Sequence, residues 1–128
     1  MRRKQRSGAD KLAGLEVFEG CTPGALALFA RHVDQVEVQP GEVLARAGRH
    51  PREVLVVRAG TARVEPGAGP TGFAGRGSVI GGREVLADVP HPATVRALTR
   101  MRLLVVDPRA FRWMAEEDGR WADGVVAA

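Results

Sequence analysis

The sequence predicts a mainly β fold, an antiparallel β-roll or jelly roll with helices at both ends. Short apolar stretches with a period of two follow one another from Val33 to Asp107, and glycine or proline turns separate them. Apolar residues with helical spacing lie before Val33 and again after Asp107. Short strands at regular intervals are typical of a sandwich or jelly roll, and the outer segments add helices to it.

The N-terminal part of the chain is expected to form two helices. A short helix is predicted over residues 11–18. A second is predicted to begin at Thr22-Pro23, because threonine is a good N-cap and proline suits the first helical position, and to run on to His32. Its apolar face consists of Leu26, Phe29, Ala30 and Val33. We expect this face to dock on the core and to have no role toward a cofactor.

The extended pattern then recurs along the chain. Strands are predicted at Val36–Val38, Glu42–Arg46, Val54–Arg58, Thr61–Glu65, near Phe73, Ala93–Thr99 and Met101–Asp107. The turn at Ala59-Gly60 predicts that the strands on either side of it form a β-hairpin. A closing helix is predicted after Asp107-Pro108, with Phe111 and Met114 on one face.

Length and charge set the domain organisation. With 128 residues the chain suits one domain, and no stretch is apolar enough to cross a membrane or to serve as a secretory signal. The net charge is +4, and the first eleven residues, with five basic and one acidic side chain, account for 5 − 1 = +4 of it. We therefore predict a flexible basic arm over residues 1–10, a domain over 11–118 and a short tail or helix remnant over 119–128.

Residue types that perform catalysis are sparse. The histidines His32, His50 and His91 lack the close spacing of a metal site, which argues against a cupin-like metal enzyme. Ser78 has no nucleophile-elbow context. The single cysteine, Cys21, excludes an internal disulfide and has no identifiable base. We expect no enzyme activity, no metal and no cofactor, and a reducing cytoplasm as the compartment.

The glycine-rich segment from Gly77 to Val95 is the most informative part of the sequence. Glycines beside a short helix expose backbone N–H groups that suit an anion, particularly a phosphate. The segment resembles the phosphate-binding cassette of the cyclic nucleotide-binding domain, the sensor of the catabolite activator protein family and of cyclic-nucleotide-gated channels. It matches the family pattern G-x-x-F-G-E-x-A-L-L-x-x-x-P-R-x-A-T-V at Gly77, Gly81, Leu86, Pro90, Ala93, Thr94 and Val95. Further matches are the Pro40-Gly41-Glu42 turn, Gly48, Gly60 and the start of the closing helix at Asp107, so the resemblance covers residues 11–118.

The resemblance also shows two departures from the family. The cassette glutamate, which binds the ribose 2′-hydroxyl in the family, is Gly82 here, and the phosphate-binding arginine is His91. Glu84 could take the place of the cassette glutamate, and Arg83 or Arg96 could take the place of the phosphate-binding arginine. The candidate ligand-binding residues are therefore Gly81, Gly82, Arg83, Glu84, His91, Pro92, Ala93 and Thr94. Because histidine is only partly charged near neutral pH, we expect weak or absent binding of cyclic AMP and cyclic GMP.

Two functions remain open at this point. The first is a regulatory or interaction module that keeps the fold, binds another protein, and binds cyclic nucleotides weakly or not at all. The second is a genuine sensor of a cyclic nucleotide or another phosphate-bearing ligand in the cassette pocket. The residues after Asp118 are too few for the helix-turn-helix that follows this domain in the family's regulators, so we expect no specific DNA binding. A membrane is not an expected partner, and a weak homodimer is possible.

Overall fold

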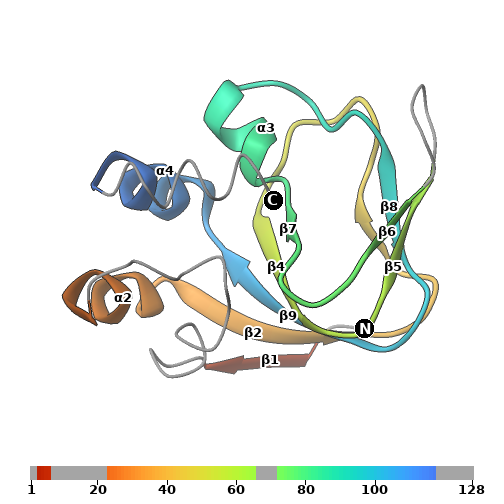
Figure 1. The fold of residues 1–128 in the computed structure, drawn as a ribbon, viewed down its shortest axis with the longest axis horizontal. Coiled ribbons are helices and arrows are strands. Elements are labelled where there is room, and N and C mark those ends of the chain that lie inside the picture. The colour runs from red at the N-terminus through yellow and green to blue at the C-terminus, as the bar shows by residue number, and fades with distance from the viewer. Residues whose placement is uncertain (1–2, 7–22, 66–71, 118–128) are drawn as a thin grey trace.

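The computed structural model describes residues 3–6, 23–65 and 72–117, and it confirms the predicted β-roll (Figure 1). Two antiparallel sheets face each other, one with the strand order β1-β2-β9-β4-β7 and one with the order β3-β8-β5-β6. The strands are β1 Arg3–Arg6, β2 Val33–Val38, β3 Val43–Ala45, β4 Val54–Ala59, β5 Ala62–Glu65, β6 Gly72–Ala74, β7 Val79–Ile80, β8 Thr94–Ala97 and β9 Met101–Val106. The helices are α2 Pro23–Ala30, α3 Gly82–Ala87 and α4 Pro108–Glu117.

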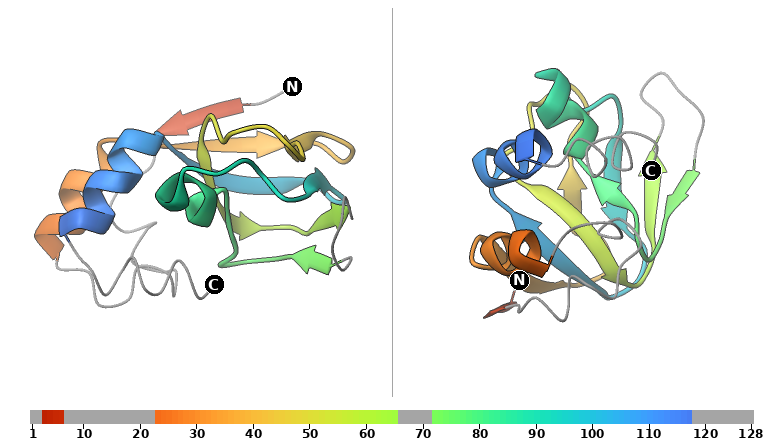
Figure 2. Two further views of the ribbon diagram at one scale, coloured as in Figure 1. Left: turned by 90° about the horizontal axis from the view of Figure 1, so that it is seen from above. Right: turned by 60° about the vertical axis from the view of Figure 1, so that its left-hand side comes forward.

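The helices lie mostly at one end of the roll. Helices α2 and α4 lie beside each other at that end, and α3 stands at the rim between the two sheets (Figures 1 and 2). Helix α2 begins where the Thr22-Pro23 pattern places it but ends at Ala30, two residues before the predicted end. The helix expected over residues 11–18 lies outside the described residues. No helix within the described ranges is long and apolar enough to cross a membrane.

Strand β4 explains how one sheet supports two cores. Its residues Val54 to Val57 are all buried, as the continuous apolar run predicted. Alternate side chains of a strand point to opposite faces, so Leu55 and Val57 join the cluster between the sheets. Val54 and Val56 join a second cluster on the outer face of the sheet, together with residues of α3 and α4. The larger sheet is therefore covered on both sides.

Helix α4 closes the outer cluster. Asp107 caps it, because its Oδ1 accepts a hydrogen bond of 2.8 Å from the backbone N–H of Arg109. Phe111 and Met114 share the buried face, as predicted, and neither side chain is exposed to solvent. Helix α4 also holds α3, since Arg112 donates hydrogen bonds of 3.0 and 3.2 Å to the carbonyl of Val85 in that helix.

The predicted hairpin around Gly60 is wrong. Strand β4 pairs with β9 and β7, whereas β5 pairs with β8 and β6, so the chain passes from one sheet to the other at this turn. Gly60 has a φ of +93°, and a Cβ there would collide with the backbone carbonyl of Arg100. The carbonyl of Thr61 accepts hydrogen bonds from Leu98 and Thr99, which hold the two corners together. A turn signal shows that the chain reverses, but long-range pairing decides which strand lies beside it.

The N-terminal segment that was predicted as a basic arm contains a short strand. Residues Arg3–Arg6 form β1, which lies antiparallel to β2 with Arg3 opposite Glu37 and Arg6 opposite Asp34. An edge strand leaves a row of backbone donors and acceptors unpaired, and these can order an adjacent segment. The basic N-terminus therefore adds a strand to the edge of the larger sheet.

Candidate functional site

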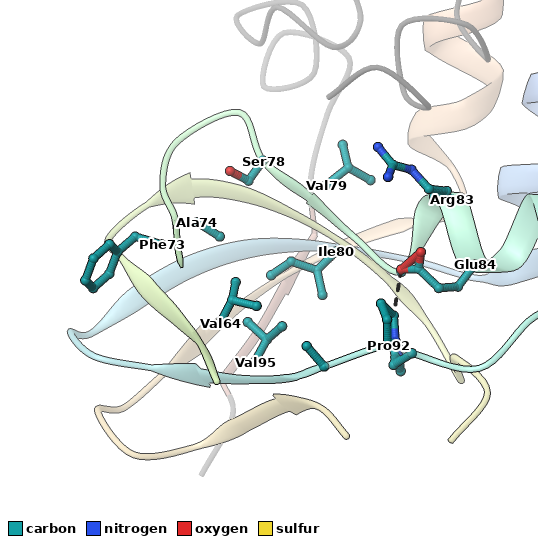
Figure 3. A pocket seen from close by; sticks show the side chains of 13 residues that line it. Val64, Phe73, Ala74, Ser78, Val79, Ile80, Arg83, Glu84, Pro92 and Val95 are labelled. Atoms are coloured by element: carbon teal, nitrogen blue, oxygen red, sulfur yellow. Dashed lines mark ion pairs between the residues drawn. The ribbon is translucent and has the colours of Figure 1, made fainter. Parts of the chain in front are cut away.

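A hollow of about 360 Å³ opens at the cassette segment, between the N-terminal end of α3 and the smaller sheet. Figure 3 shows its apolar floor, formed by Val64, Ile80 and Val95, with Phe73 at one rim and Glu84 at the other. The polar side chains that line it are those of Ser78, Arg83, Glu84 and His91. The hollow therefore combines an apolar floor with polar groups on the α3 side, which is the usual composition of a small-molecule site.

Local geometry brings α3 to the rim of this hollow. Gly81 precedes the helix with φ +88° and ψ −6°, a left-handed conformation that favours glycine. A Cβ at Gly81 would lie 3.3 Å from Cε1 of His91 and 3.2 Å from the carbonyl oxygen of Glu53. The glycine thus permits a sharp turn from β7 into α3 and lets the imidazole approach the backbone closely.

His91 is held by its backbone rather than by its side chain. Its N–H donates to the carbonyl of Arg49 at 2.9 Å, and its own carbonyl accepts from Gly48 at 2.8 Å. These two hydrogen bonds join the loop before β8 to the loop between β3 and β4. The two bonds fix the backbone of His91 in the wall of the hollow, where the residue is only 8% exposed.

Glu84 and His91 face each other across the hollow without forming a strong ion pair. Oε1 of Glu84 lies 3.9 Å from Nδ1 of His91, which is longer than a hydrogen bond. Burial lowers the pKa of His91, and the nearby charge of His50 adds to this shift. Burial also raises the pKa of Glu84, partly offset by Arg83. The lowered pKa favours the neutral imidazole near neutral pH, at the position where the sequence comparison expects an arginine.

The structure brings together six of the eight predicted site residues: Gly81, Arg83, Glu84, His91, Pro92 and Ala93 line the hollow. Gly82 is buried in the first turn of α3 and does not line it. The hydroxyl of Thr94 accepts a hydrogen bond of 3.1 Å from the N–H of Ala47. Of the two positions considered for an acidic ribose contact, Gly82 and Glu84, only Glu84 lines the hollow.

Arg96 does not supply the missing charge. Its Nε lies 2.9 Å from Oε1 of Glu65, and its NH1 donates to the carbonyl of Gly41 at 3.0 Å. Both contacts hold the guanidinium away from the hollow, which it does not line. Arg83, by contrast, lines the hollow and is exposed. Of the two arginines considered from the sequence, only Arg83 can contact a ligand in the hollow.

Sequence reasoning did not assign the apolar floor to the site. Val64 lies on β5, Phe73 and Ala74 on β6, and Val95 on β8. Cross-strand register places Val64 opposite both Val95 and Gly72, so these strands present one continuous surface. The period-two pattern could have indicated the inward direction of Ala74 and Val95, but only the pairing of β5 with β8 shows that these strands face the cassette.

No cluster of three histidine, cysteine or acidic side chains that could hold a metal ion occurs among residues 3–6, 23–65 and 72–117. The polar groups of the hollow are the side chains of Ser78, Arg83, Glu84 and His91 and the backbone at Gly81.

The ionisation of His91 predicts a pH effect on stability. Because its pKa is lower in the folded chain, the unfolded chain binds more protons just below pH 6.5, and the free energy of unfolding should fall as the pH falls through this range. In the variant His91→Gln, the free energy of unfolding should decrease less between pH 7.5 and pH 5.5 than in the unmodified chain. Urea unfolding at pH 7.5 and 5.5 measures this difference, with His32→Gln as the control; an equal fall in both variants would contradict the role given to His91.

Comparisons with known proteins agree with this fold. The family model described as the cyclic nucleotide-binding domain matches residues 35–118. Acetyltransferase Pat from Mycolicibacterium smegmatis is 34% identical over 107 residues, which are 80% of this chain and 32% of that protein. The structure of a cAMP-binding acyltransferase from Mycobacterium smegmatis is 31% identical, with a TM-score of 0.74 over 93% of this chain and 38% of that chain.

A more distant structure shows the same roll. The regulatory domain of Toxoplasma gondii PKA with cAMP has a TM-score of 0.79 at 16% identity, covering 90% of this chain and 45% of that chain. The chain spans only about a third of the length of the curated acetyltransferase that it matches. The matched residues, the strand order and the position of the hollow lead to one conclusion: this chain belongs to the cyclic nucleotide-binding domain family.

Proposed function

We propose that this chain is a regulatory domain that keeps the cyclic nucleotide-binding roll but binds cyclic AMP and cyclic GMP weakly or not at all. The observation that carries the proposal is a buried histidine, His91, in the wall of the hollow at the position of the family's phosphate-binding arginine, where burial lowers the imidazole pKa. Arg96 is paired with Glu65 and does not compensate for it. The cassette backbone is retained, but the cation that would neutralise a cyclic phosphate is replaced.

The size of the loss follows from ordinary hydrogen-bond energies. A hydrogen bond to a charged group contributes about 1.5–3 kcal/mol. Losing the contacts of a glutamate at Gly82 and an arginine at His91 would remove about 3–6 kcal/mol, or roughly 10²–10⁴ in affinity. Glu84 lies two residues after Gly82 and approaches the hollow from a different direction along α3. A ribose contact by Glu84 would therefore require a different ligand orientation.

An open hollow favours a second candidate function, a sensor of another small molecule. Side chains do not fill the space beside Gly81 and His91, where about 360 Å³ remains accessible. The apolar floor suits a planar ring, and Arg83 at the rim suits a phosphoryl group. This ligand would bind through Gly81, Arg83, Glu84 and His91 and would not be one of the two common cyclic nucleotides.

Regulation, not catalysis, is the role we propose for the domain itself. In Acetyltransferase Pat the matched region makes up 32% of the protein. By analogy, any enzyme activity would belong to another domain or protein, and this roll would alter that partner through its surface. We also propose that it works in the cytoplasm and does not read DNA sequence.

A ligand titration separates the two candidates. We expect cyclic AMP and cyclic GMP at 1 mM to raise the melting temperature little. A nucleotide present at 100 times its dissociation constant would add about 2.7 kcal/mol to the free energy of unfolding and give a clear shift. Thermal unfolding with both nucleotides and with cyclic dinucleotides measures the shift, and isothermal calorimetry measures the affinity. A clear shift with cyclic AMP or cyclic GMP would overturn the proposed weak binding, and a shift with cyclic dinucleotides alone would support the sensor.

A further inference from the structure

A second hollow lies on the loop between β3 and β4 and shares His91 with the cassette hollow. Its volume is about 250 Å³, and its apolar base is formed by Val43, Leu44 and Ala45. Its polar lining consists of Arg46, Arg49, His50, Arg52 and Glu53. We call it the basic hollow. In Figure 1 its loop is the yellow segment that runs beside the connection from α3 to β8.

Backbone hydrogen bonds hold this loop in one shape. The N–H of Gly48 and the carbonyl of Arg49 bond to His91 at 2.8 and 2.9 Å, and the N–H of Ala47 donates to Thr94 at 3.1 Å. The N–H of Arg49 donates to the carbonyl of Arg46 at 3.2 Å, which closes a tight turn. The arginines therefore project from a backbone that is already ordered, and a ligand would not have to order it on binding.

The charges of the basic hollow are not balanced. Arg46, Arg49 and Arg52 are exposed, and none of them forms an ion pair with a carboxylate in the part of the chain that the structure describes. Glu53 contributes one negative charge against three positive ones. Three guanidinium groups around one small space repel each other, so an anion between them would relieve the repulsion.

We propose that the basic hollow binds a small polyanion with adjacent phosphoryl groups. Guanidinium groups present fixed pairs of N–H donors that match phosphoryl oxygens, and charge-assisted hydrogen bonds of this kind are the strongest that a surface site makes. The volume of about 250 Å³ suits a compact ligand such as a diphosphate group rather than a long chain. This site is separate from the cassette hollow, because the two share His91 alone among their lining residues.

Pyrophosphate is the probe for this proposal. The three histidines of the chain allow its position to be followed by NMR, since His50 and His91 line the basic hollow and His32 lines a different one beside α4. We expect the imidazole resonances of His50 and His91 to shift with pyrophosphate at pH 7.5 and those of His32 to stay. Resonances of His32 that move equally would show general charge screening and would overturn the proposal.

Matched variants test the arginines. Arg49→Gln with Arg52→Gln should weaken pyrophosphate binding about 100-fold, at roughly tenfold for each lost fork, as measured by calorimetry in 50 mM salt. The control is Arg63→Gln with Arg109→Gln, which removes the same charge from exposed positions outside the basic hollow and should change the affinity about threefold or less. Equal losses in the two variants would mean that binding follows net charge only, which overturns the site.

Two further comparisons test where pyrophosphate binds and whether the basic hollow prefers phosphoryl groups to carboxylates. Arg83→Gln alters the cassette hollow alone, so a loss of pyrophosphate binding in this variant with none in the Arg49 and Arg52 variant would place the anion in the cassette and overturn the proposal. Citrate carries similar charge on carboxylates, and we expect it to bind more weakly. Equal binding of citrate would overturn the preference for phosphoryl groups. Neither outcome depends on whether the chain binds cyclic AMP.

Discussion

A variant with Gly82→Glu and His91→Arg should bind cyclic AMP about 10²–10⁴ times more tightly than the unmodified chain. Gly82 lies in the first helical turn of α3 and is not among the glycines with positive φ, so its backbone conformation suits residues other than glycine. The backbone of His91 is fixed by its hydrogen bonds to Gly48 and Arg49, so an arginine would start from an ordered position. Isothermal calorimetry measures the gain.

The control for this double variant introduces polar side chains without charge at both positions. Gly82→Gln with His91→Gln should leave the affinity near that of the unmodified chain. Thermal unfolding of each variant shows whether the roll is intact. A charged variant that folds and gains no affinity would show that the hollow does not admit a nucleotide, and it would also remove the basis for comparing this cassette with that of the family.

The largest loss of stability is expected from Phe111→Ala. The side chain is fully buried in the outer cluster with Val33, Leu104 and Met114. Truncation of a buried phenylalanine costs about 3–5 kcal/mol, because the lost burial is joined by the cost of the cavity. Helix α4 would then lose the contact that holds it on the larger sheet. Urea unfolding at pH 7.5 measures the change.

Phe73→Ala is the matched control for that variant. Phe73 is 71% exposed at the rim of the cassette hollow, so its removal should change the free energy of unfolding by about 0.5 kcal/mol or less. A similar cost for both substitutions would contradict the burial that distinguishes them. A cost below about 1 kcal/mol for Phe111→Ala would mean that α4 does not depend on this side chain.

Local signals predicted most of the elements. The apolar run Val54–Val57, the Asp107-Pro108 start of α4 and the cassette glycines are all read from a few neighbouring residues, and the structure has the predicted elements at each of them. The two-residue strand β7 was not predicted, since its length leaves too little pattern to recognise. Elements whose signal lies within one turn or strand are therefore the ones that a single sequence can show.

Long-range pairing decided what the sequence could not show. The turn at Gly60 looks like a hairpin, but β9 occupies the place beside β4. Arg96 was a candidate for the cassette charge, yet the register of β8 against β5 places it opposite Arg63 and beside Glu65. Strand pairs and ion pairs between residues this distant in sequence depend on how both sheets pack, and the residues next to them in the sequence do not indicate them.

The alternation of the chain between the two sheets limits how this domain can move. From β2 to β5 each successive strand joins the opposite sheet, and the same happens from β6 to β9. Neither sheet can separate from the other without pulling the corner at Gly60 and the corner at Arg100 apart. We therefore expect a conformational change at the rim to displace α3 and α4, which the hydrogen bonds from Arg112 to Val85 join, and to leave the two sheets together.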